Sequence, residues 1–290
     1  MDSSVLSNTA VYTARKLTRR WEDLCAQYLP VAPEGSIWRY NRSPDPEMRA
    51  QGWKLHVSAT ILNAHKILAK IAPLLVTHEL QFKAPSSLQE VAQLNSGVHY
   101  SYSQVGKVIT VYPHSDEQAV SLARHLDELT RRFVGPAIPF DNRLRPGSNV
   151  YYRYGAFRAM EIAAADGGKI PALKDQRGNL VPDLYLTGSA KPEWVQDPFV
   201  GKARQRVVEA DNPFQHSFRV FQALSQRGKG GVYQAFDMTV QPPRLCLLKE
   251  GRKAGEMGWE GRDGRWRVAH ERVALTTLRG RGVDVPRIYS

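Results

Sequence analysis

Residues 53–59, WKLHVSA, alternate strictly between apolar and polar side chains. This period of two predicts a strand with one buried face. The apolar set is Trp53, Leu55, Val57 and Ala59, and the polar set is Lys54, His56 and Ser58. The polar face therefore offers a cation, a titratable imidazole and a hydroxyl within one strand. Such a face is either an ordinary solvated surface or an anion site that carries its own acid.

The chain has 290 residues and 42% hydrophobic residues, enough for one large domain or two ordinary ones with a proper core. Its net charge of +12 favours a negatively charged partner, namely nucleic acid, phosphate or an acidic peptide. Nucleic acid is the weakest of these, because the basic residues are spread along the chain and no DNA-binding module is recognisable.

Cysteine usage and the N-terminus indicate a cytoplasmic protein. Cys25 and Cys246 are far apart and show no metal-binding spacing, which argues against a disulfide framework and a structural zinc site. The N-terminal residues lack the basic start and apolar core of a signal peptide. No apolar run approaches the ~18–20 residues that cross a bilayer, so we expect no membrane partner.

Hydrophobic periodicity predicts an α+β fold. In residues 1–160 we expect helices over 9–29, 63–75, 87–94 and 115–133, and strands over 53–59, 81–84, 107–112 and 150–155. Ser87, with Glu90 three residues on, and Ser115 are the expected helix caps. Pro and Gly predict a linker with little regular structure over 161–214. In residues 215–290 we expect strands over 218–224, 231–236, 245–249 and 285–289, and a helix that contains Glu271.

Further cations and one phenol decorate the predicted strands of the first domain. They are Lys83 on the second strand, Lys107 and Tyr112 at the ends of the third, and Arg143, Arg145 and Arg153 around the last. Each alone is more often a solvated surface residue. If the strands share a sheet, however, the cations converge on the face of Lys54 and His56. No acidic residue adjoins Lys54, Lys83 or Lys107 in the sequence, so the set predicts an uncompensated pocket for a dianion.

Four segments in order, GWKLHVSAT, FKAP, LNSGVHYSYSQVGKVITVYP and RPGSNVYYRYGAF, resemble the N-terminal lyase domain of class III lanthipeptide synthetases. The strand with Lys54 and His56 also resembles that of bacterial effector phosphothreonine lyases. The resemblance covers roughly residues 35–160. It implies a phosphothreonine-lyase-like fold and the β-elimination of phosphate from phosphoserine or phosphothreonine in a precursor peptide.

The resemblance also implies roles for these residues. Lys83 would be the base and His56 the acid, and the step would need no metal or cofactor. Phosphate would be held by Lys54, Lys107, Arg143 and Arg153, with Arg145 a weaker candidate and Tyr112 orienting an oxygen or the base. The family often carries more basic residues before the Gly106-Lys107 pair. Here His99, Tyr100 and Tyr102 occupy that segment, either as replacement ligands or as plain packing residues.

The segment LSQRGKGGVYQAFD, with Gly228, Gly230 and Gly231, resembles the glycine-rich loop of protein kinases, although a hairpin without a ligand has the same pattern. Lys249 and Glu271 follow at the places of the kinase lysine–glutamate pair, so residues 215–290 resemble a kinase N-lobe. No catalytic-loop or metal-binding aspartate motif follows. We therefore expect no kinase activity at this length, and a use for ATP and Mg²⁺ only if a C-lobe is supplied elsewhere.

Two functions remain open at the level of sequence. The first is a phosphate-eliminating lyase that acts on a phosphorylated precursor peptide with its leader, alongside kinase and cyclase domains or proteins. The alternative is a non-catalytic module that binds a phosphopeptide or leader peptide and works with a separate kinase. The open β-sheet lobe is a hypothetical dock for the leader. Lyase activity would require Lys83 and His56, whereas binding alone would depend mainly on Lys54, Lys107 and the arginines.

Overall fold

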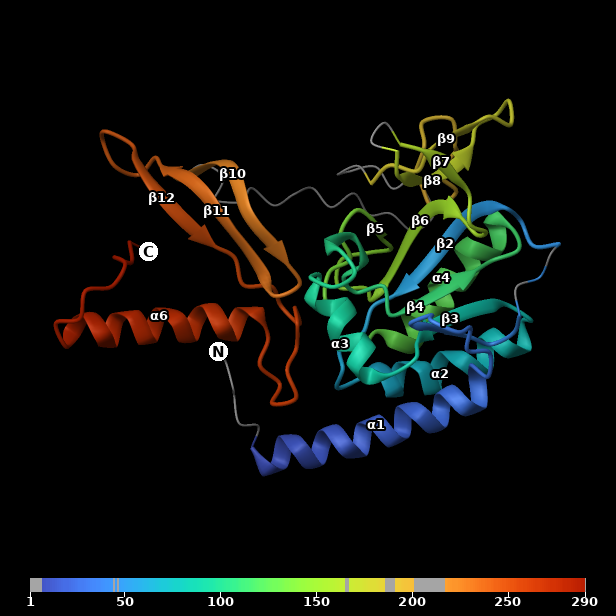
Figure 1. Ribbon diagram of the computed structural model, residues 1–290, viewed down its shortest axis with the longest axis horizontal. Helices are drawn as coiled ribbons and strands as arrows, with labels where there is room; N and C mark the ends of the chain where they lie inside the picture. The colour runs from blue at the N-terminus through green and yellow to red at the C-terminus, as the bar shows by residue number, and fades with distance from the viewer. Residues whose placement is uncertain are drawn as a thin grey trace.

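A computed structural model describes residues 7–43, 45, 47–164, 167–185, 191–200 and 217–289, and its largest feature is a six-stranded antiparallel sheet (Figure 1). The strand order is β1-β3-β4-β2-β6-β5. The strands are β1 (Trp38–Tyr40), β2 (Gln51–Val57), β3 (Gln81–Pro85), β4 (Ile109–Tyr112), β5 (Asn142–Arg143) and β6 (Val150–Ala156). The alternating stretch forms β2, whose backbone is paired on both sides by β4 and β6.

Helices cover one face of this sheet. They are α1 (Asn8–Tyr28), α2 (Ala64–Thr77), α3 (Leu88–Ser96) and α4 (Asp116–Thr130), with a short 3₁₀ turn, η1 (Tyr102–Gln104). α4 packs on β2 and β6, α2 packs on α4, and α1 lies outside α2 (Figure 1). The predicted caps are confirmed, because the hydroxyls of Ser87 and Ser115 each accept a hydrogen bond from the first turn. Each such cap typically contributes ~1 kcal/mol.

The core explains the alternation of β2. Trp53, Leu55 and Val57 are at most 1% exposed and face the helices, which stabilises the fold by about 2 kcal/mol for each side chain. Lys54 and His56 must then point to the opposite face. His56 is only 5% exposed, so the interpretation of that face as an ordinary solvated surface is wrong. The strand has the predicted length but lies two residues earlier, since it runs from Gln51 to Val57.

A small three-stranded sheet follows β6 and lies above it in Figure 1. Its strands are β7 (Glu161–Ala163), β8 (Lys169–Lys174) and β9 (Leu180–Pro182). The expectation of little regular structure is therefore wrong for residues 161–164 and 167–182, while part of the predicted linker, over 186–190 and 201–214, lies outside the described residues. The composition misled because short strands joined by tight turns, such as the one with Gly178 at φ +84°, carry the same Pro and Gly residues as a linker.

The C-terminal part forms a second three-stranded sheet, β10 (Phe218–Arg227), β11 (Gly230–Asp237) and β12 (Arg244–Lys249), and a helix, α6 (Gly264–Gly280). These elements lie beside the first sheet in Figure 1. The predicted strand over 285–289 is wrong, because that segment pairs with no described strand. The hairpin between β10 and β11 contacts the end of α3, where the amide of Gly228 donates to the carbonyl of Ser96 at 2.9 Å.

Across the described residues, no helix is both long enough and apolar enough to cross a membrane.

Candidate active site

The register of the sheet brings the predicted cations together. Directly opposite residues of antiparallel neighbours point to the same side. Lys54 lies opposite Arg153 on β6, and His56 lies opposite Thr110 on β4. Thr110 in turn lies opposite Lys83 on β3. Lys54, His56, Lys83 and Arg153 therefore share the face that points away from the helices.

A carboxylate that the sequence analysis missed, that of Asp141, joins two of the predicted residues. Its Oδ1 lies 3.1 Å from Nζ of Lys107, and its Oδ2 lies 2.6 Å from Nδ1 of His56. The Asp141 side chain is fully buried, and Lys107, just before β4, is buried as well. Because Asp141 engages Nδ1, the other ring nitrogen of His56, Nε2, is the one left for a substrate.

Burial and neighbouring charges set the protonation of this pair. Burial lowers the pKa of His56 to about 4, and Lys107 and Lys54 act in the same direction against the opposing charge of Asp141. Burial alone would raise the pKa of Asp141, but the charges of Lys107 and His56 bring it down to about 2. A dianion bound beside His56 would favour the imidazolium form and so create an acid.

Lys83 lies in surroundings that favour its neutral amine. Burial lowers its pKa to about 7, and repulsion by Lys54 and Lys107 adds to the shift. Two aromatic rings of β1 flank the amine, with Nζ 4.1 Å from the ring centre of Trp38 and 5.9 Å from that of Tyr40. A lysine with this pKa is a competent base near neutral pH.

The charged ends of the Lys54 and Arg153 side chains lie close together beside Gly155. Burial lowers the pKa of Lys54 to about 8, while the charge of Asp183 partly restores it and Arg153 lowers it further. A Cβ atom at Gly155 would lie 3.2 Å from Nη1 of Arg153 and 3.5 Å from Nζ of Lys54. The absence of a side chain at Gly155 therefore makes room for the two cations side by side.

A segment that follows β9 closes over Arg153. Nη1 and Nη2 of Arg153 donate to the two carboxylate oxygens of Asp183, and Nη2 also donates to the carbonyl of Leu184 at 3.1 Å. The ring of Tyr185 lies 4.0 Å from the guanidinium carbon of Arg153 and 4.8 Å from Nζ of Lys107. Tyr185 thus covers two of the predicted phosphate ligands.

The expectation of an uncompensated cation pocket is wrong, because Asp141 and Asp183 neutralise part of its charge. Both acids are distant in sequence from the cations that they meet. Asp141 lies in a predicted loop, close to Arg143 and Arg145 in the sequence. An acidic residue in such a loop is normally interpreted as a surface charge. Asp183 and Tyr185 fall in the segment predicted to be a linker. No motif or periodicity in the sequence singles out these two acids.

The other predicted ligands lie around this cluster. Tyr112 shares the same face, packs edge-on against Phe157 at 5.2 Å, and has its pKa raised by burial. Arg143 is exposed at the sheet edge, with its guanidinium carbon 5.0 Å from the ring centre of Tyr151. Arg145 is held away by Asp127, at 2.6 Å. The structure thus gathers Lys54, Lys107 and Arg153, and leaves Arg143 and Arg145 at the margin.

The aromatic segment before Lys107 is engaged elsewhere. The hydroxyl of Tyr100 donates to the carboxylate of Glu90 on α3 at 2.5 Å. This contact takes the place of the one that the Glu90 carboxylate would make with the backbone amide of Ser87 in a capping box. Tyr102 contacts the guanidinium group of Arg252, which comes from beyond β12. His99 packs near Tyr100, with ring centres 6.5 Å apart. These contacts favour the interpretation of these residues as packing residues.

The glycines, Lys249 and Glu271 that the sequence analysis singled out lie in the β10–β11 hairpin, on β12 and on α6, and their resemblance to a kinase N-lobe stays a prediction. Lys249 and Glu271 form an ion pair between β12 and α6. Gly230 and Gly231 open β11 after the turn that holds Gly228. A Cβ atom at Gly228 would lie 1.7 Å from the carbonyl oxygen of Asn95, so this glycine serves a close contact with the first domain.

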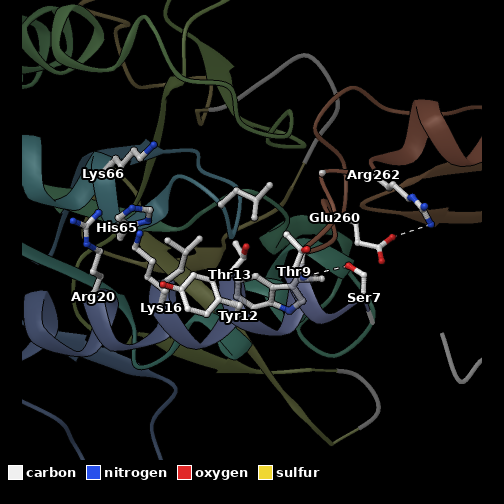
Figure 2. Close-up of a pocket in the computed structure, with 15 residues that line it drawn as sticks. Ser7, Thr9, Tyr12, Thr13, Lys16, Arg20, His65, Lys66, Glu260 and Arg262 are labelled. Atoms are coloured by element: carbon white, nitrogen blue, oxygen red, sulfur yellow. Dashed lines mark hydrogen bonds and ion pairs between the residues drawn. The ribbon is translucent and has the colours of Figure 1, made fainter. Parts of the chain in front are cut away.

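A separate hollow of about 820 Å³ lies between α1, α2 and the turn over residues 259–262. Figure 2 shows Arg20, His65 and Lys66 at one end of it and the ion pair of Glu260 with Arg262 at the other. The cations that line this hollow are exposed, whereas Lys107 and Arg153 on the sheet face are 3–4% exposed. The sheet face is therefore the stronger candidate for a reactive site.

Within the ranges that the structure describes, no three His, Cys, Asp or Glu side chains gather in an arrangement that would hold a metal ion. The prediction of an elimination without metal or cofactor stays a prediction.

Comparison with known sequences identifies the family. A sequence profile described as "RamC, N-terminal domain" matches residues 30–211, which is more than half of the chain. The chain belongs to the RamC N-terminal domain family. Among curated relatives of this family member is the probable SapB synthase of Streptomyces coelicolor, 34% identical over 251 residues, which are 85% of this chain and 26% of that protein. The chain thus spans about a quarter of the length of this relative.

The solved structures that are similar to this RamC-type chain include two phosphothreonine lyases. The type III effector phosphothreonine lyase OspF from Shigella flexneri is 14% identical, with a TM-score of 0.35 over 50% of this chain and 87% of that one. The VirA (SpvC) phosphothreonine lyase effector from Chromobacterium violaceum is 15% identical, with a TM-score of 0.34 over 49% and 86%. The family match confirms the resemblance to lanthipeptide synthetases, and the described elements confirm the α+β class.

Proposed function

We propose that this chain is a lyase that eliminates phosphate from phosphoserine or phosphothreonine in a ribosomal precursor peptide, giving dehydroalanine or dehydrobutyrine in lanthipeptide biosynthesis. One observation carries the proposal. A lysine with a pKa lowered to about 7, Lys83, shares a sheet face with a histidine oriented by a buried carboxylate and with the cations of Lys54 and Arg153.

The proposed step is a β-elimination. The amine of Lys83 removes the α-proton of the phosphorylated residue, and the electron pair of that C–H bond becomes the Cα=Cβ double bond. The bond between Cβ and the phosphate oxygen breaks, and Nε2 of His56 gives a proton to the leaving phosphate. Lys83 ends protonated and His56 ends neutral, so the pair is reset when Lys83 releases one proton to solvent and His56 takes one up.

The remaining cations hold the leaving group. Lys107 and Lys54 supply point charges, and Arg153 supplies a planar fork that fits two phosphate oxygens. Asp141 keeps Nε2 of His56 aimed toward the phosphate through its contact with Nδ1. The charge of a bound dianion raises the affinity of His56 for a proton, which prepares the acid only when substrate is present.

Family membership supports this proposal, and the name of the S. coelicolor relative, SapB synthase, is consistent with a biosynthetic role. The proposed partners are a phosphorylated precursor peptide with its leader, and kinase and cyclase domains or proteins. The phosphate would be placed by a kinase that acts before this step.

We also propose a kinase N-lobe-like identity for residues 215–290, supported by the ion pair of Lys249 with Glu271. In this proposal the lyase step needs no ATP, and Mg²⁺ and ATP matter only where a kinase C-lobe is present.

A decisive test uses intact mass measurement of a synthetic phosphothreonine peptide that carries a leader, incubated with the protein and EDTA without ATP. The expected product has lost the elements of phosphoric acid. Lys83→Ala should abolish the product, whereas Lys66→Ala, an exposed lysine of α2 on the opposite side of the sheet, should leave it unchanged.

Two other outcomes would reject the lyase. Loss of phosphate that leaves a hydroxyl behind would identify a phosphatase. An unchanged peptide that binds saturably would favour the alternative, a phosphopeptide or leader-peptide binding module that works with a separate kinase.

A further inference from the structure

The guanidinium fork of Arg153 is already occupied by the protein itself. Both terminal nitrogens donate to the carboxylate of Asp183, in the end-on arrangement that a phosphate would also use. The side chains of Arg153 and Asp183 are 5% and 8% exposed, so the pair is shielded from water. A ligand phosphate and the carboxylate of Asp183 therefore compete for the same donors.

We propose that Asp183 is a specificity-determining residue, which occupies the Arg153 subsite in the free protein and restricts it to ligands with two negative charges. This inference rests on the proposed function only in taking phosphate as the natural ligand. The inference concerns how Asp183 selects ligands by their charge, and it holds whether or not the bound phosphate is eliminated.

The tether of Asp183 makes it a strong competitor. Asp183 directly follows β9, whose pairing with β8 holds the segment in place. A carboxylate attached to the protein has an effective concentration of roughly millimolar or higher at its subsite. A free carboxylate or another monoanion gains one ion pair with Arg153 and displaces an equal one. It therefore binds poorly at lower concentrations.

A phosphate dianion has more to gain. It carries a second charge, and Lys54 and Lys107 lie close to the fork that it would enter. Asp183 has two carboxylate oxygens, and both are bonded to Arg153. A phosphate has a third oxygen, which can contact one of these two lysines. The additional attraction offsets the loss of the Asp183 pair. A phosphorylated side chain is mostly dianionic near neutral pH, so it meets this requirement.

Tyr185 extends the same cover. Its ring lies against Arg153 and Lys107 and meets the ring of Phe140 edge-on, with centres 6.1 Å apart. Phe140 has φ +63°, a backbone conformation that bulky residues rarely adopt, and it directly precedes Asp141. The segment over 183–185 is thus packed directly against residues that form the site.

The test compares methyl phosphate with methyl sulfate, which match in shape and differ in charge at pH near 7.5. Isothermal titration of the full chain gives the affinity of each probe for the wild type, Asp183→Asn and Glu161→Gln. Glu161 is a matched control, because it lies in the small sheet that Asp183 follows and forms its ion pair with exposed Lys169 and not with Arg153.

The expected wild type prefers methyl phosphate. Asp183→Asn should bind both probes about tenfold tighter or more, as expected for a freed bond to a charged group, so that methyl sulfate, which the wild type binds poorly, now binds measurably. Glu161→Gln should keep the wild-type affinity for both probes. Weaker or unchanged binding of the probes by Asp183→Asn, or an equal change in Glu161→Gln, would overturn the proposal.

Asp183→Ser, which also removes the charge, repeats the test if the asparagine variant unfolds in a thermal melt. The elimination assay separates this inference from the proposed function. Tighter binding of the probes by Asp183→Asn without any elimination by the wild type would leave the inference standing and remove the lyase. Elimination by the wild type with unchanged affinities in Asp183→Asn would do the reverse.

Discussion

The Nδ1 atom of His56 and the Oδ2 atom of Asp141 lie 2.6 Å apart, although 85 positions separate the two residues in the chain. The other oxygen of Asp141 lies 3.1 Å from Nζ of Lys107. One buried carboxylate thus orients the proposed acid and anchors a proposed phosphate ligand, which couples proton donation to phosphate binding.

Asp141→Asn should lower kcat for elimination by about 100-fold or more, the scale of a mispositioned general acid. The Michaelis constant for the phosphopeptide should not rise, because the change removes a negative charge near the phosphate. The split between kcat and KM measures this. Asp116→Asn, which breaks the half-exposed pair with Arg49, is the control and should leave both constants unchanged. A raised KM with normal kcat would contradict the proposed role.

Lys83→Met should abolish elimination and stabilise the protein near neutral pH. The folded-state pKa of Lys83 is about 7, below its ordinary value of 10.5, so the folded state binds fewer protons between these values. Stability of the wild type therefore rises with pH across this window, and the advantage of Lys83→Met is full below pH 7 and vanishes toward pH 10.5.

Melting temperatures of the wild type and Lys83→Met from pH 6 to pH 10 measure this difference. Lys66→Met, which alters an exposed lysine, should show a difference from the wild type that does not change with pH. A constant difference for Lys83→Met would show that its ammonium form is not disfavoured by folding.

Gly155→Ala should weaken phosphate binding while the fold is kept. The new methyl group would press on the flexible ends of Arg153 and Lys54. We expect kcat/KM to fall about tenfold, since ~1.4 kcal/mol corresponds to one such factor. Titration with methyl phosphate and a thermal melt separate binding from stability. Gly280→Ala, where the methyl group meets nothing within 4 Å, is the control. An equal loss of methyl phosphate affinity in both variants would contradict this prediction.

Gly228→Ala should loosen the contact between the β10–β11 hairpin and α3. Its Cβ atom would overlap the carbonyl oxygen of Asn95, so the hairpin must move away. The Asn95 side chain also accepts from the amide of Gly106, so faster hydrogen exchange should extend over residues 95–106. Gly258→Ala, whose nearest new contact is 3.7 Å, should exchange like the wild type. Unchanged exchange in Gly228→Ala would exclude a tight contact.

The four long helices and the strands β2, β3, β4 and β6 of the first domain were predictable because their signals are local, whereas the short strands β1 and β5 were not predicted. The alternation of β2 and the serine caps of α3 and α4 act within a few residues. Lys54, His56, Lys83 and Arg153 could be placed on one face as soon as their strands shared a sheet.

The acids of the site were not predictable in the same way. Asp141 and Asp183 lie outside the long strands, so no periodicity fixes where their side chains point. Their contacts depend on how loops fold back over the sheet. The short strands β7 to β9 were not predicted for a related reason. Each has only three to six residues, so its periodicity is weak, and the nearby Pro and Gly residues favour a loop.

The contact of Asp183 with Arg153 bears on how this chain can be divided for experiments. A fragment cut at residue 160 would retain every predicted residue of the lyase site and lose the carboxylate that covers Arg153. Its buried guanidinium would then be unpaired, and any buffer anion would be free to enter. Crystals or binding data from such a fragment would describe a more permissive site than the one in the intact chain.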